Sequence, residues 1–233
     1  MKRVGLIAGS AYRDLLSGGE AEVERLSTDF GDASIWVASS LAFIPRHGVN
    51  NSIPPHRINH HANMSAFKEL GVSWVIGINS TGSLRKALPP KSLIVPHDYI
   101  NPWGIKTLFH DKIRHITPGF DEELRALILD TARKMGIDVR AGGIYIQTTG
   151  PRLETKAEIE MLRSFGDVIG MTMATEATLA KELELPYASL CSVDNFCHGI
   201  TEVPLTENEI LGAARQNVDT IKRLIHGVLE ELK

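Results

Sequence analysis

The chain has few cysteines, no long apolar run and no excess of charge of either sign. Its two cysteines, Cys191 and Cys197, are too few for a disulfide framework, and they do not have the spacing with histidine that zinc sites use. We therefore expect no metal ion and a reducing compartment, the cytoplasm. No apolar stretch approaches the roughly 20 residues of a membrane span. The apolar run Val4–Ala8 is also too short for the core of a signal peptide.

The charge balance argues against a nucleic-acid-binding protein. The sequence holds 25 basic and 28 acidic residues, for a net charge of -3, so a broad basic face is not expected. Hydrophobic residues make up 43% and charged residues 23%, which is typical of a soluble globular protein. A small, locally positive anion site remains compatible with these totals.

Short apolar runs alternate with helical patterns along the chain. Continuous apolar runs of this length are typical of strands covered on both faces. The alternation predicts an α/β fold with a mixed central β-sheet flanked by helices, in one domain spanning residues 1–233. The predicted strands are Val4–Ala8, Ile35–Ala38, Leu41–Ile44, Trp74–Ile78, Leu93–Val95, Gly143–Ile146, Val168–Ile169 and Tyr187–Val193. The predicted helices are His56–Leu70, Asp121–Met135, Thr155–Phe165 and Thr206–Leu232, the last two beginning with capping boxes.

Three groups of polar residues follow predicted strands and suit an anion. Ala8-Gly9-Ser10-Ala11 offers backbone N–H groups and a hydroxyl, although alone it is better explained as a plain turn. Arg46-His47-Gly48 supplies a planar fork of donors that suits phosphate, or else a surface arginine beside a turn glycine. Asn79-Ser80-Thr81-Gly82-Ser83 suits a site at the carboxyl end of a strand, or a turn that caps a helix.

Three further groups lie at later strand ends. Thr149–Thr155 contains Glu154, which we place in the first turn of a helix, where acids are common for electrostatic reasons alone. Gly170-Met171-Thr172-Met173, followed by Glu176, could be core packing. Ser192–Phe196 ends a strongly apolar strand. No single group decides a function, but together they indicate a small-molecule site built from several strand ends.

The stretch Tyr99–Phe120 is rich in histidine, proline, glycine and aromatic residues and has no clear period. A loop of this length in a compact domain is usually functional or lies at an interface.

In this order, the six groups resemble the trimeric purine nucleoside phosphorylase and methylthioadenosine phosphorylase family. The resemblance implies the nucleoside phosphorylase fold, a homotrimer or a dimer of trimers, and no cofactor beyond inorganic phosphate as co-substrate. It extends from Gly5 to about Leu232, and its most specific stretches are Arg46-His47-Gly48, Ile53-Pro54-Pro55 with Asn59 and Ala62-Asn63, Gly82-Ser83-Leu84-Arg85, Gly150–Thr155 and Gly170-Met171-Thr172.

The resemblance also implies roles for individual residues. Met171 would lie against the ribose, and His115 would reach from the irregular loop into the neighbouring subunit's site. Asn195, Glu154 and His47 would be catalytic, and Leu153 would join Glu154 and Asn195 in the purine pocket. The phosphate site would consist of Ser10, Arg46, His47, Asn79, Ser80 and Thr172, with Ser80 contributing chiefly its backbone N–H.

These residue types fit the phosphorolysis that the family carries out. Its transition state resembles a ribosyl cation with a departing purine anion, so catalysis is mostly positioning and electrostatics. Relatives that cleave 6-oxopurines pair glutamate with asparagine at the positions of Glu154 and Asn195, because N1–H needs an acceptor and O6 a donor. A mismatched base would leave buried polar groups unpaired. The pair predicts a 6-oxopurine enzyme, but a shift of register by one would present Asp194 to the base and favour adenine.

The sequence indicates less clearly which group the enzyme accepts at the 5′ position of the nucleoside. Ile210 could line an apolar pocket for a 5′-methylthio group, whereas Glu207 could accept from a 5′-hydroxyl or point to solvent. The pattern around Cys191 and Phe196 is most similar to the methylthioinosine phosphorylase branch. We therefore expect inosine, guanosine and methylthioinosine as one substrate class.

The sequence departs from the family pattern at two points, and three other functions are alternatives to this one. Leu153 replaces the aromatic residue that relatives often stack on the purine, and the irregular loop that holds His115 is shorter than in many relatives. The main alternative is a methylthioadenosine phosphorylase. A nucleosidase that uses water is disfavoured by Arg46, and a purine-binding module without catalysis is disfavoured by the complete phosphate set.

Overall fold

A mixed β-sheet forms the centre of the molecule. The computed structural model describes residues 2–9, 12, 22–38, 40–202 and 217–232. Within this part of the chain, eight strands follow the order β2-β3-β4-β1-β5-β10-β9-β7, and β11, β6 and β8 extend the sheet from the other side of β5. The strands are β1 (Val4–Ala8), β2 (Glu22–Thr28), β3 (Gly31–Val37), β4 (Leu41–Pro45), β5 (Trp74–Ser83), β6 (Leu93–Val95), β7 (Asp98–Ile100), β8 (Arg140–Ala141), β9 (Ile144–Gln147), β10 (Val168–Gly170) and β11 (Tyr187–Phe196).

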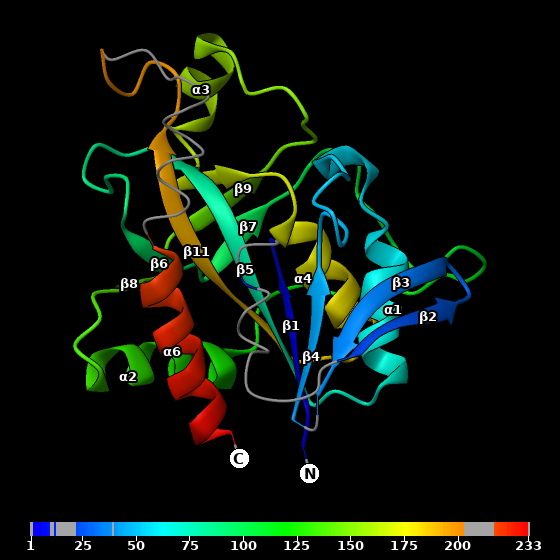
Figure 1. The fold of residues 1–233 in the computed structure, drawn as a ribbon. Helices are drawn as coiled ribbons and strands as arrows, with labels where there is room; N and C mark the ends of the chain where they lie inside the picture. Colours follow the sequence, from blue (N-terminus) through cyan, green and yellow to red (C-terminus); the bar gives the residue numbers. More distant parts are fainter. Residues whose placement is uncertain (1, 10–11, 13–21, 39, 203–216, 233) are drawn as a thin grey trace.

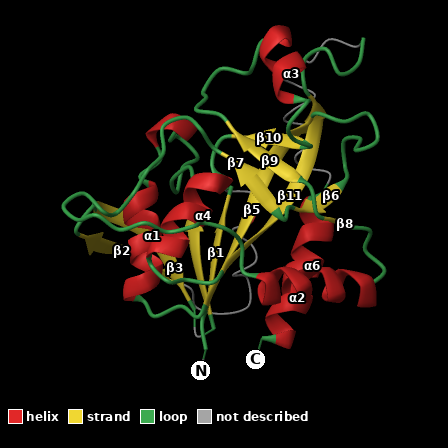
Figure 2. Ribbon diagram, turned by 180° about the vertical axis from the view of Figure 1, so that it is seen from behind, coloured by secondary structure: helices red, strands yellow, loops and turns green. Residues whose placement is uncertain are grey.

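Helices cover both faces of this sheet (Figures 1 and 2). α1 (His60–Glu69) and α4 (Met173–Glu182) lie on one face, and α2 (Glu122–Lys134) and α6 (Val218–Glu231) lie on the other. The short helix α3 (Lys156–Leu162) stands at the far end of the molecule from the two termini (Figure 1).

The alternation of side chains along β1 explains why helices cover both faces of the sheet. Ile7 packs into the cluster that contains α1 and α4, whereas Leu6 and Ala8 pack into the cluster that contains α2 and α6. Successive side chains of a strand point to opposite faces, so a wholly apolar strand requires cover on both sides. The predicted α/β fold with a mixed, helix-flanked sheet is therefore confirmed.

The sheet divides along β5, and this division creates room for a site. β1 pairs in parallel with β5 only as far as Gly77. On the same edge, β10 pairs antiparallel with Gly82 and Ser83 at the other end of β5. The segment 78–81 lies between these two neighbours, beyond the carboxyl end of β1. Sheets of this kind bind ligands where neighbouring strands separate in this way.

All eight predicted strands are present, but several elements were not predicted. β2, β7, β8 and α4 are additions. α1 begins at His60 instead of His56, because Pro55–Arg57 forms a separate 3₁₀ turn and Asn59 caps the helix by accepting from Ala62 N at 3.1 Å. The predicted capping box at Thr155 and Glu158 is confirmed, whereas that at Thr206 lies outside the described residues.

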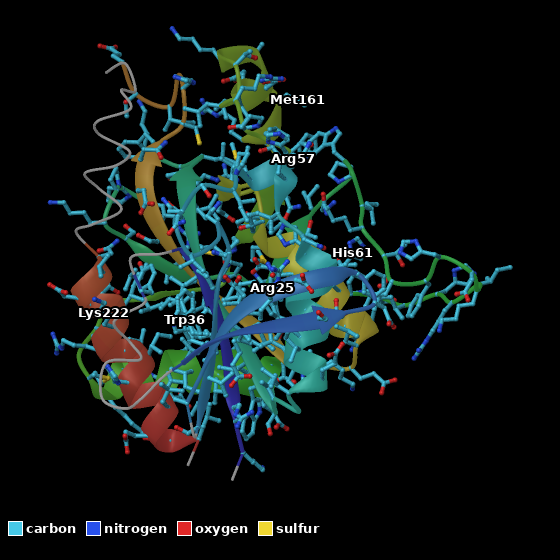
Figure 3. All side chains as sticks on the ribbon, turned by 45° about the vertical axis from the view of Figure 1, so that its right-hand side comes forward. Arg25, Trp36, Arg57, His61, Met161 and Lys222 are labelled. Carbon is cyan, nitrogen blue, oxygen red and sulfur yellow. The ribbon has the colours of Figure 1, made fainter. Side chains whose placement is uncertain are left out.

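The irregular stretch is narrower than predicted because Tyr99 and Ile100 belong to β7. Residues 101–120 run past α1 and project from the body of the protein, next to the labelled His61 (Figure 3). The His61 Nε2 atom lies 3.0 Å from the carbonyl oxygen of Thr107, and its ring stacks on Phe30. Among the described helices, none is both long and apolar enough to cross a membrane.

Candidate active site

One large cavity, of about 950 Å³, opens beyond the carboxyl end of β1, where the sheet divides. Its walls come from β5, β11, the segment after β4, the residues before α3 and the start of α4. Many of the predicted site residues meet here, although they lie far apart in the sequence. The predicted residues that line it are Arg46, His47, Ser80, Leu153, Glu154, Met171, Thr172, Asp194 and Asn195.

Arg46 is held rigidly at the bottom of this cavity. It is 3% exposed, and its guanidinium donates to both carboxylate oxygens of Glu176, from Nε at 2.5 Å and from Nη2 at 3.0 Å. Nη1 and Nη2 also donate to the carbonyl oxygens of Ile78 and Ile7, each at 3.0 Å. These contacts use four of the five guanidinium N–H groups. A ligand in the cavity is therefore left with one N–H, on Nη1, and not with the free fork that the sequence suggested.

Glu176 is the centre of this buried network. It is fully buried and also accepts from the Tyr187 hydroxyl at 2.9 Å. Burial alone would lower the pKa of Arg46, but the adjacent Glu176 carboxylate offsets this and the net pKa is raised. Gly77 makes the arrangement possible, because a Cβ at this position would collide with the Tyr187 hydroxyl. The ion pair keeps Arg46 charged in a place where an isolated cation would be very costly.

His47 lies beside Arg46 with one ring nitrogen already occupied. Its Nδ1 donates to the carbonyl oxygen of Ile53 at 2.8 Å, which leaves Nε2 for the cavity. Burial lowers the pKa of His47, and this outweighs the opposite effect of the Ile53 carbonyl. The neutral ring therefore offers Nε2 as an acceptor, and the protonated ring offers it as a donor.

Thr172 brings a hydroxyl and a helix N-terminus to the same end of the cavity. It is the N-cap residue of α4, but its side chain does not cap the helix. Instead, Asn79 Nδ2 donates to Thr172 Oγ1 at 2.9 Å, and Asn79 Oδ1 accepts from Ser189 at 2.8 Å. This leaves the Thr172 hydroxyl proton free to point into the cavity. Asn79 is 1% exposed and does not line the cavity, so the structure places it behind Thr172.

Glu154 lines the same cavity. α3 begins at Lys156 with Thr155 as its N-cap, so the placement of Glu154 in the first helical turn is wrong. Its Oε1 accepts from the Thr148 hydroxyl at 2.7 Å, and its backbone carbonyl accepts from His198 Nδ1 at 2.9 Å. Two neighbours thus fix its position without using Oε2.

Met171 and Leu153 supply apolar surface to the cavity. Met171 packs on Gly150, where a Cβ would lie 2.5 Å from its sulfur. Leu153 is 41% exposed at the mouth of the cavity. Apolar lining with a few polar groups is typical of a pocket for a small molecule.

A β-bulge at the end of β11 turns two consecutive polar residues into the cavity. Val193 pairs with Thr81 and Asn195 pairs with Gly82, so Asp194 is the extra residue of the strand. Both Asp194 and Asn195 consequently line the cavity, although side chains of consecutive strand residues normally point to opposite faces. Gly82 leaves space for this, because a Cβ there would lie 2.7 Å from Cys197 Sγ and 3.2 Å from Asn195 Nδ2.

Asp194 is poised to exchange a proton near neutral pH. It is 2% exposed and accepts from the Ser192 hydroxyl at 2.6 Å and from the Ser80 hydroxyl by a short hydrogen bond. Burial raises the pKa of its carboxyl to about 7, against the opposite influence of Ser192. Asn195 is less constrained: its Nδ2 donates to the carbonyl oxygen of Phe196 at 3.0 Å.

The remaining predicted residues are not placed in this cavity. His115 is exposed in the loop and does not line it. Ser10, Glu207 and Ile210 lie outside the described residues. The sequence reasoning missed the lining residues Tyr12, Thr148, Cys197 and His198, although the last two directly follow the Ser192–Phe196 group and could have been included with it. The described residues contain no cluster of histidine, cysteine and carboxylate side chains that could hold a metal ion.

Comparison with known proteins identifies the family of this chain. Residues 19–230 match the model of the phosphorylase superfamily. A probable 6-oxopurine nucleoside phosphorylase from Archaeoglobus fulgidus is 42% identical over 98% of this chain and 96% of its own length. A probable S-methyl-5′-thioinosine phosphorylase from Thermodesulfovibrio yellowstonii is 36% identical, covering 99% and 91%. An S-methyl-5′-thioadenosine phosphorylase from Saccharolobus solfataricus is 33% identical, covering 98% and 89%.

A solved structure shares the whole fold. Methylthioadenosine phosphorylase from Schistosoma mansoni in complex with adenine superposes with a TM-score of 0.90, covering 100% of this chain and 92% of that one, at 24% sequence identity. The predicted nucleoside phosphorylase fold is thereby confirmed, as is the resemblance from which it came. The chain belongs to the phosphorylase superfamily and is an enzyme of its pentosyl-transferring, nucleoside phosphorylase type.

Proposed function

We propose that this enzyme cleaves the N-glycosidic bond of 6-oxopurine nucleosides, with inorganic phosphate as the attacking group, to give the free base and a ribose 1-phosphate. Inosine, guanosine and methylthioinosine form the proposed substrate class, and the proposed role is purine salvage. The observation that carries this proposal is that one cavity is lined both by groups that suit an anion, Arg46, His47 and Thr172, and by groups that suit a purine, Glu154, Asp194 and Asn195, with the apolar side chain of Met171 in the same lining.

The phosphate would lie at the Arg46 end. One N–H of Arg46, His47 Nε2, the Thr172 hydroxyl and the N-terminus of α4 converge there. The Arg46 N–H and the Thr172 hydroxyl are donors and the helix N-terminus is a positive dipole, and all three suit phosphate oxygens. His47 Nε2 donates to phosphate when the ring is protonated, and the neutral ring accepts from a protonated phosphate oxygen instead. Ser10 and the backbone N–H of Ser80 complete the proposed set, and Asn79 holds Thr172 in place.

The purine would lie against Glu154, Asp194 and Asn195. Glu154 Oε2 is available to accept from N1–H, and the Asn195 amide can donate to O6 once it leaves the Phe196 carbonyl. Leu153 would cover the base at the mouth of the cavity. This pairing of acceptor and donor is complementary to hypoxanthine and guanine and opposite to that of adenine.

The proposed reaction needs no covalent intermediate with the enzyme. A phosphate oxygen forms a bond to C1′ as the bond between C1′ and N9 breaks, and the electron pair of that bond leaves with the purine. A protonated Asp194 can donate to N7 as charge arrives on the base, because its pKa of about 7 keeps a proton available at neutral pH. Arg46, His47 and Thr172 stabilise the transition state by holding an anion beside the cationic sugar.

Methylthioadenosine phosphorolysis is a second candidate, and the bulge at Asp194 favours it. A carboxyl at this point can serve a 6-aminopurine, and the bulge brings Asp194 into the cavity together with Asn195. The two candidates differ in which residue faces the 6-position of the base.

A substrate panel separates the candidates. Values of kcat/KM for inosine, guanosine, methylthioinosine and methylthioadenosine should be measured with and without phosphate. We expect the first three to be cleaved faster than methylthioadenosine, and only with phosphate. Faster cleavage of methylthioadenosine would support the second candidate, and turnover without phosphate would indicate a hydrolase.

A matched pair of variants tests the phosphate end. Arg46→Met should abolish saturation by phosphate. Arg125→Met removes another buried arginine, which donates to the carbonyl oxygen of Pro96 at 2.7 Å, and it should leave the KM for phosphate unchanged.

The proposed enzyme is a cytoplasmic homotrimer or dimer of trimers. The loop 101–120 projects from the subunit (Figure 3), and its His115 is exposed and would complete a neighbouring site. Ile113, on the same loop, is 92% exposed, which is typical of a side chain that a partner covers. Two buried free cysteines suit a reducing compartment.

A further inference from the structure

A chain of buried hydrogen bonds connects the start of α6 to the cavity. Asn217, the N-cap residue of α6, donates from Nδ2 to the Ser192 hydroxyl oxygen at 2.9 Å. The Ser192 hydroxyl in turn donates to Asp194 Oδ1 at 2.6 Å. These three side chains are 6%, 3% and 2% exposed, so water competes little for any of these contacts.

The direction of this chain is fixed by the donors available. A serine hydroxyl has one proton and two acceptor sites, whereas the Asn217 amide nitrogen can only donate. Once Asn217 donates to Ser192, the hydroxyl proton is directed to Asp194. Asn217 does not cap α6 with its side chain, so its amide is not engaged in the usual helix-capping contact.

This donation opposes the effect of burial on Asp194. Burial favours the neutral carboxyl, and the hydrogen bond from Ser192 favours the carboxylate. Two other described groups interact electrostatically with Asp194, namely Tyr12 and Cys191. Burial raises the pKa of both, that of Cys191 to about 12, so both are neutral at physiological pH. The hydroxyls that donate to the Asp194 carboxyl, those of Ser192 on Oδ1 and Ser80 on Oδ2, are therefore the neighbours placed to adjust its titration. Ser192 is the one of the two that Asn217 links to α6.

We propose that Ser192 and Asn217 are positioning residues that set the protonation state of Asp194, and that the N-cap of α6 thereby controls activity at the base. This inference rests on the proposed function, in which the protonated Asp194 donates to the leaving purine. Neither residue touches the reacting atoms. Their effect passes through the carboxyl oxygen that Ser192 contacts.

The pH dependence of kcat/KM tests this proposal. Activity that needs a protonated Asp194 falls as pH rises through its pKa, which gives an alkaline limb to the profile. Ser192→Ala removes a donor from the carboxylate, so the limb should move to higher pH by about one unit. Asn217→Ala leaves Ser192 in place but no longer directs its proton, and should move the limb in the same direction by a smaller amount.

The controls separate this role from a loss of packing. Ser83→Ala removes another buried serine hydroxyl, which donates to the carbonyl oxygen of Arg85 at 2.8 Å, and it should leave the limb unchanged. Ser192→Thr retains a hydroxyl and should return the limb toward that of the wild-type enzyme. If Ser192→Ala does not fold, Asn217→Ala decides the question.

The outcomes for the two proposals are distinguishable. An active wild-type enzyme whose limb stays in place, or moves to lower pH, in Ser192→Ala and Asn217→Ala would overturn this inference alone. Absence of phosphate-dependent turnover in the wild type would overturn the proposed function instead. In that case, carbon-13 NMR of the Asp194 carboxyl, assigned with Asp194→Asn, still tests the inference: an equal pKa in wild type and Ser192→Ala would refute it.

Discussion

The buried ion pair between Arg46 and Glu176 gives the sharpest prediction about stability. Glu176→Gln keeps the size of the side chain and removes its charge. The guanidinium of Arg46, which is 3% exposed, would then have only neutral acceptors, namely the introduced amide oxygen and the carbonyl oxygens of Ile7 and Ile78. Removing one partner of a buried pair costs roughly 3–5 kcal/mol, because the other charge stays buried without compensation. For a domain of this size that corresponds to a fall in Tm of about 6–20 °C.

Urea and thermal unfolding measure this loss, and a control on the same helix defines its origin. Glu182 is also buried in α4 but accepts from the neutral donors Thr107 Oγ1 and Leu108 N, at 2.7 and 2.6 Å. Glu182→Gln should cost about 1–3 kcal/mol, as expected for hydrogen bonds without a buried cation. A loss below about 1 kcal/mol in Glu176→Gln would refute the claim that this carboxylate compensates Arg46.

A double variant separates the two roles of Arg46. Replacing both charges, as in Arg46→Met with Glu176→Met, leaves no uncompensated ion and should recover much of the stability lost in Glu176→Gln. Recovery is expected to be partial, because the Tyr187 hydroxyl loses its acceptor. The double variant should still show no saturation by phosphate. Normal phosphate dependence in this stable variant would mean that Arg46 has a purely structural role.

Three further outcomes are expected. Burial raises the pKa of Asp194 from 3.8 to about 7, so the folded protein holds this proton more tightly than the unfolded chain and its stability falls as pH rises through this window. Asp194→Asn should therefore match the wild type in urea unfolding near pH 4 and exceed it by roughly 2–4 kcal/mol at pH 8, whereas a constant difference would contradict the shift. Asn195→Asp should move the ratio of kcat/KM toward methylthioadenosine, and an unchanged ratio would exclude Asn195 from base recognition. Asn79→Ala, which releases Thr172, should raise the KM for phosphate about tenfold with little change in the KM for nucleoside, and equal changes in both would refute this positioning role.

The sequence predicted most of the sheet because its strands are continuous apolar runs covered on both faces. β2 was not predicted, because it is an edge strand that pairs with β3 and has glutamates at positions 22 and 24. The helix α4 was not predicted either, for a different reason. It is buried on nearly all sides, so its small and apolar residues, such as Ala174 and Ala177, show no amphipathic period.

The sequence predicted which strand ends form the candidate site. It did not predict the contacts among the side chains of the site. The pairing of Arg46 with Glu176 joins residues 130 positions apart, and no local pattern indicates it. The bulge at Asp194 is a property of strand pairing, so the sequence allowed either Asp194 or Asn195 to face the base. The structure presents both predicted residues, Asp194 and Asn195, to the cavity.

In the proposed reaction phosphate, and not water, takes the sugar from a 6-oxopurine nucleoside. The most direct measurement incubates the enzyme with inosine and phosphate labelled with oxygen-18, and then quantifies hypoxanthine and the sugar product. We expect one ribose 1-phosphate for each hypoxanthine, with a labelled oxygen joined to C1′, and no base release when phosphate is omitted. Free ribose, or hypoxanthine released at the same rate without phosphate, would contradict it.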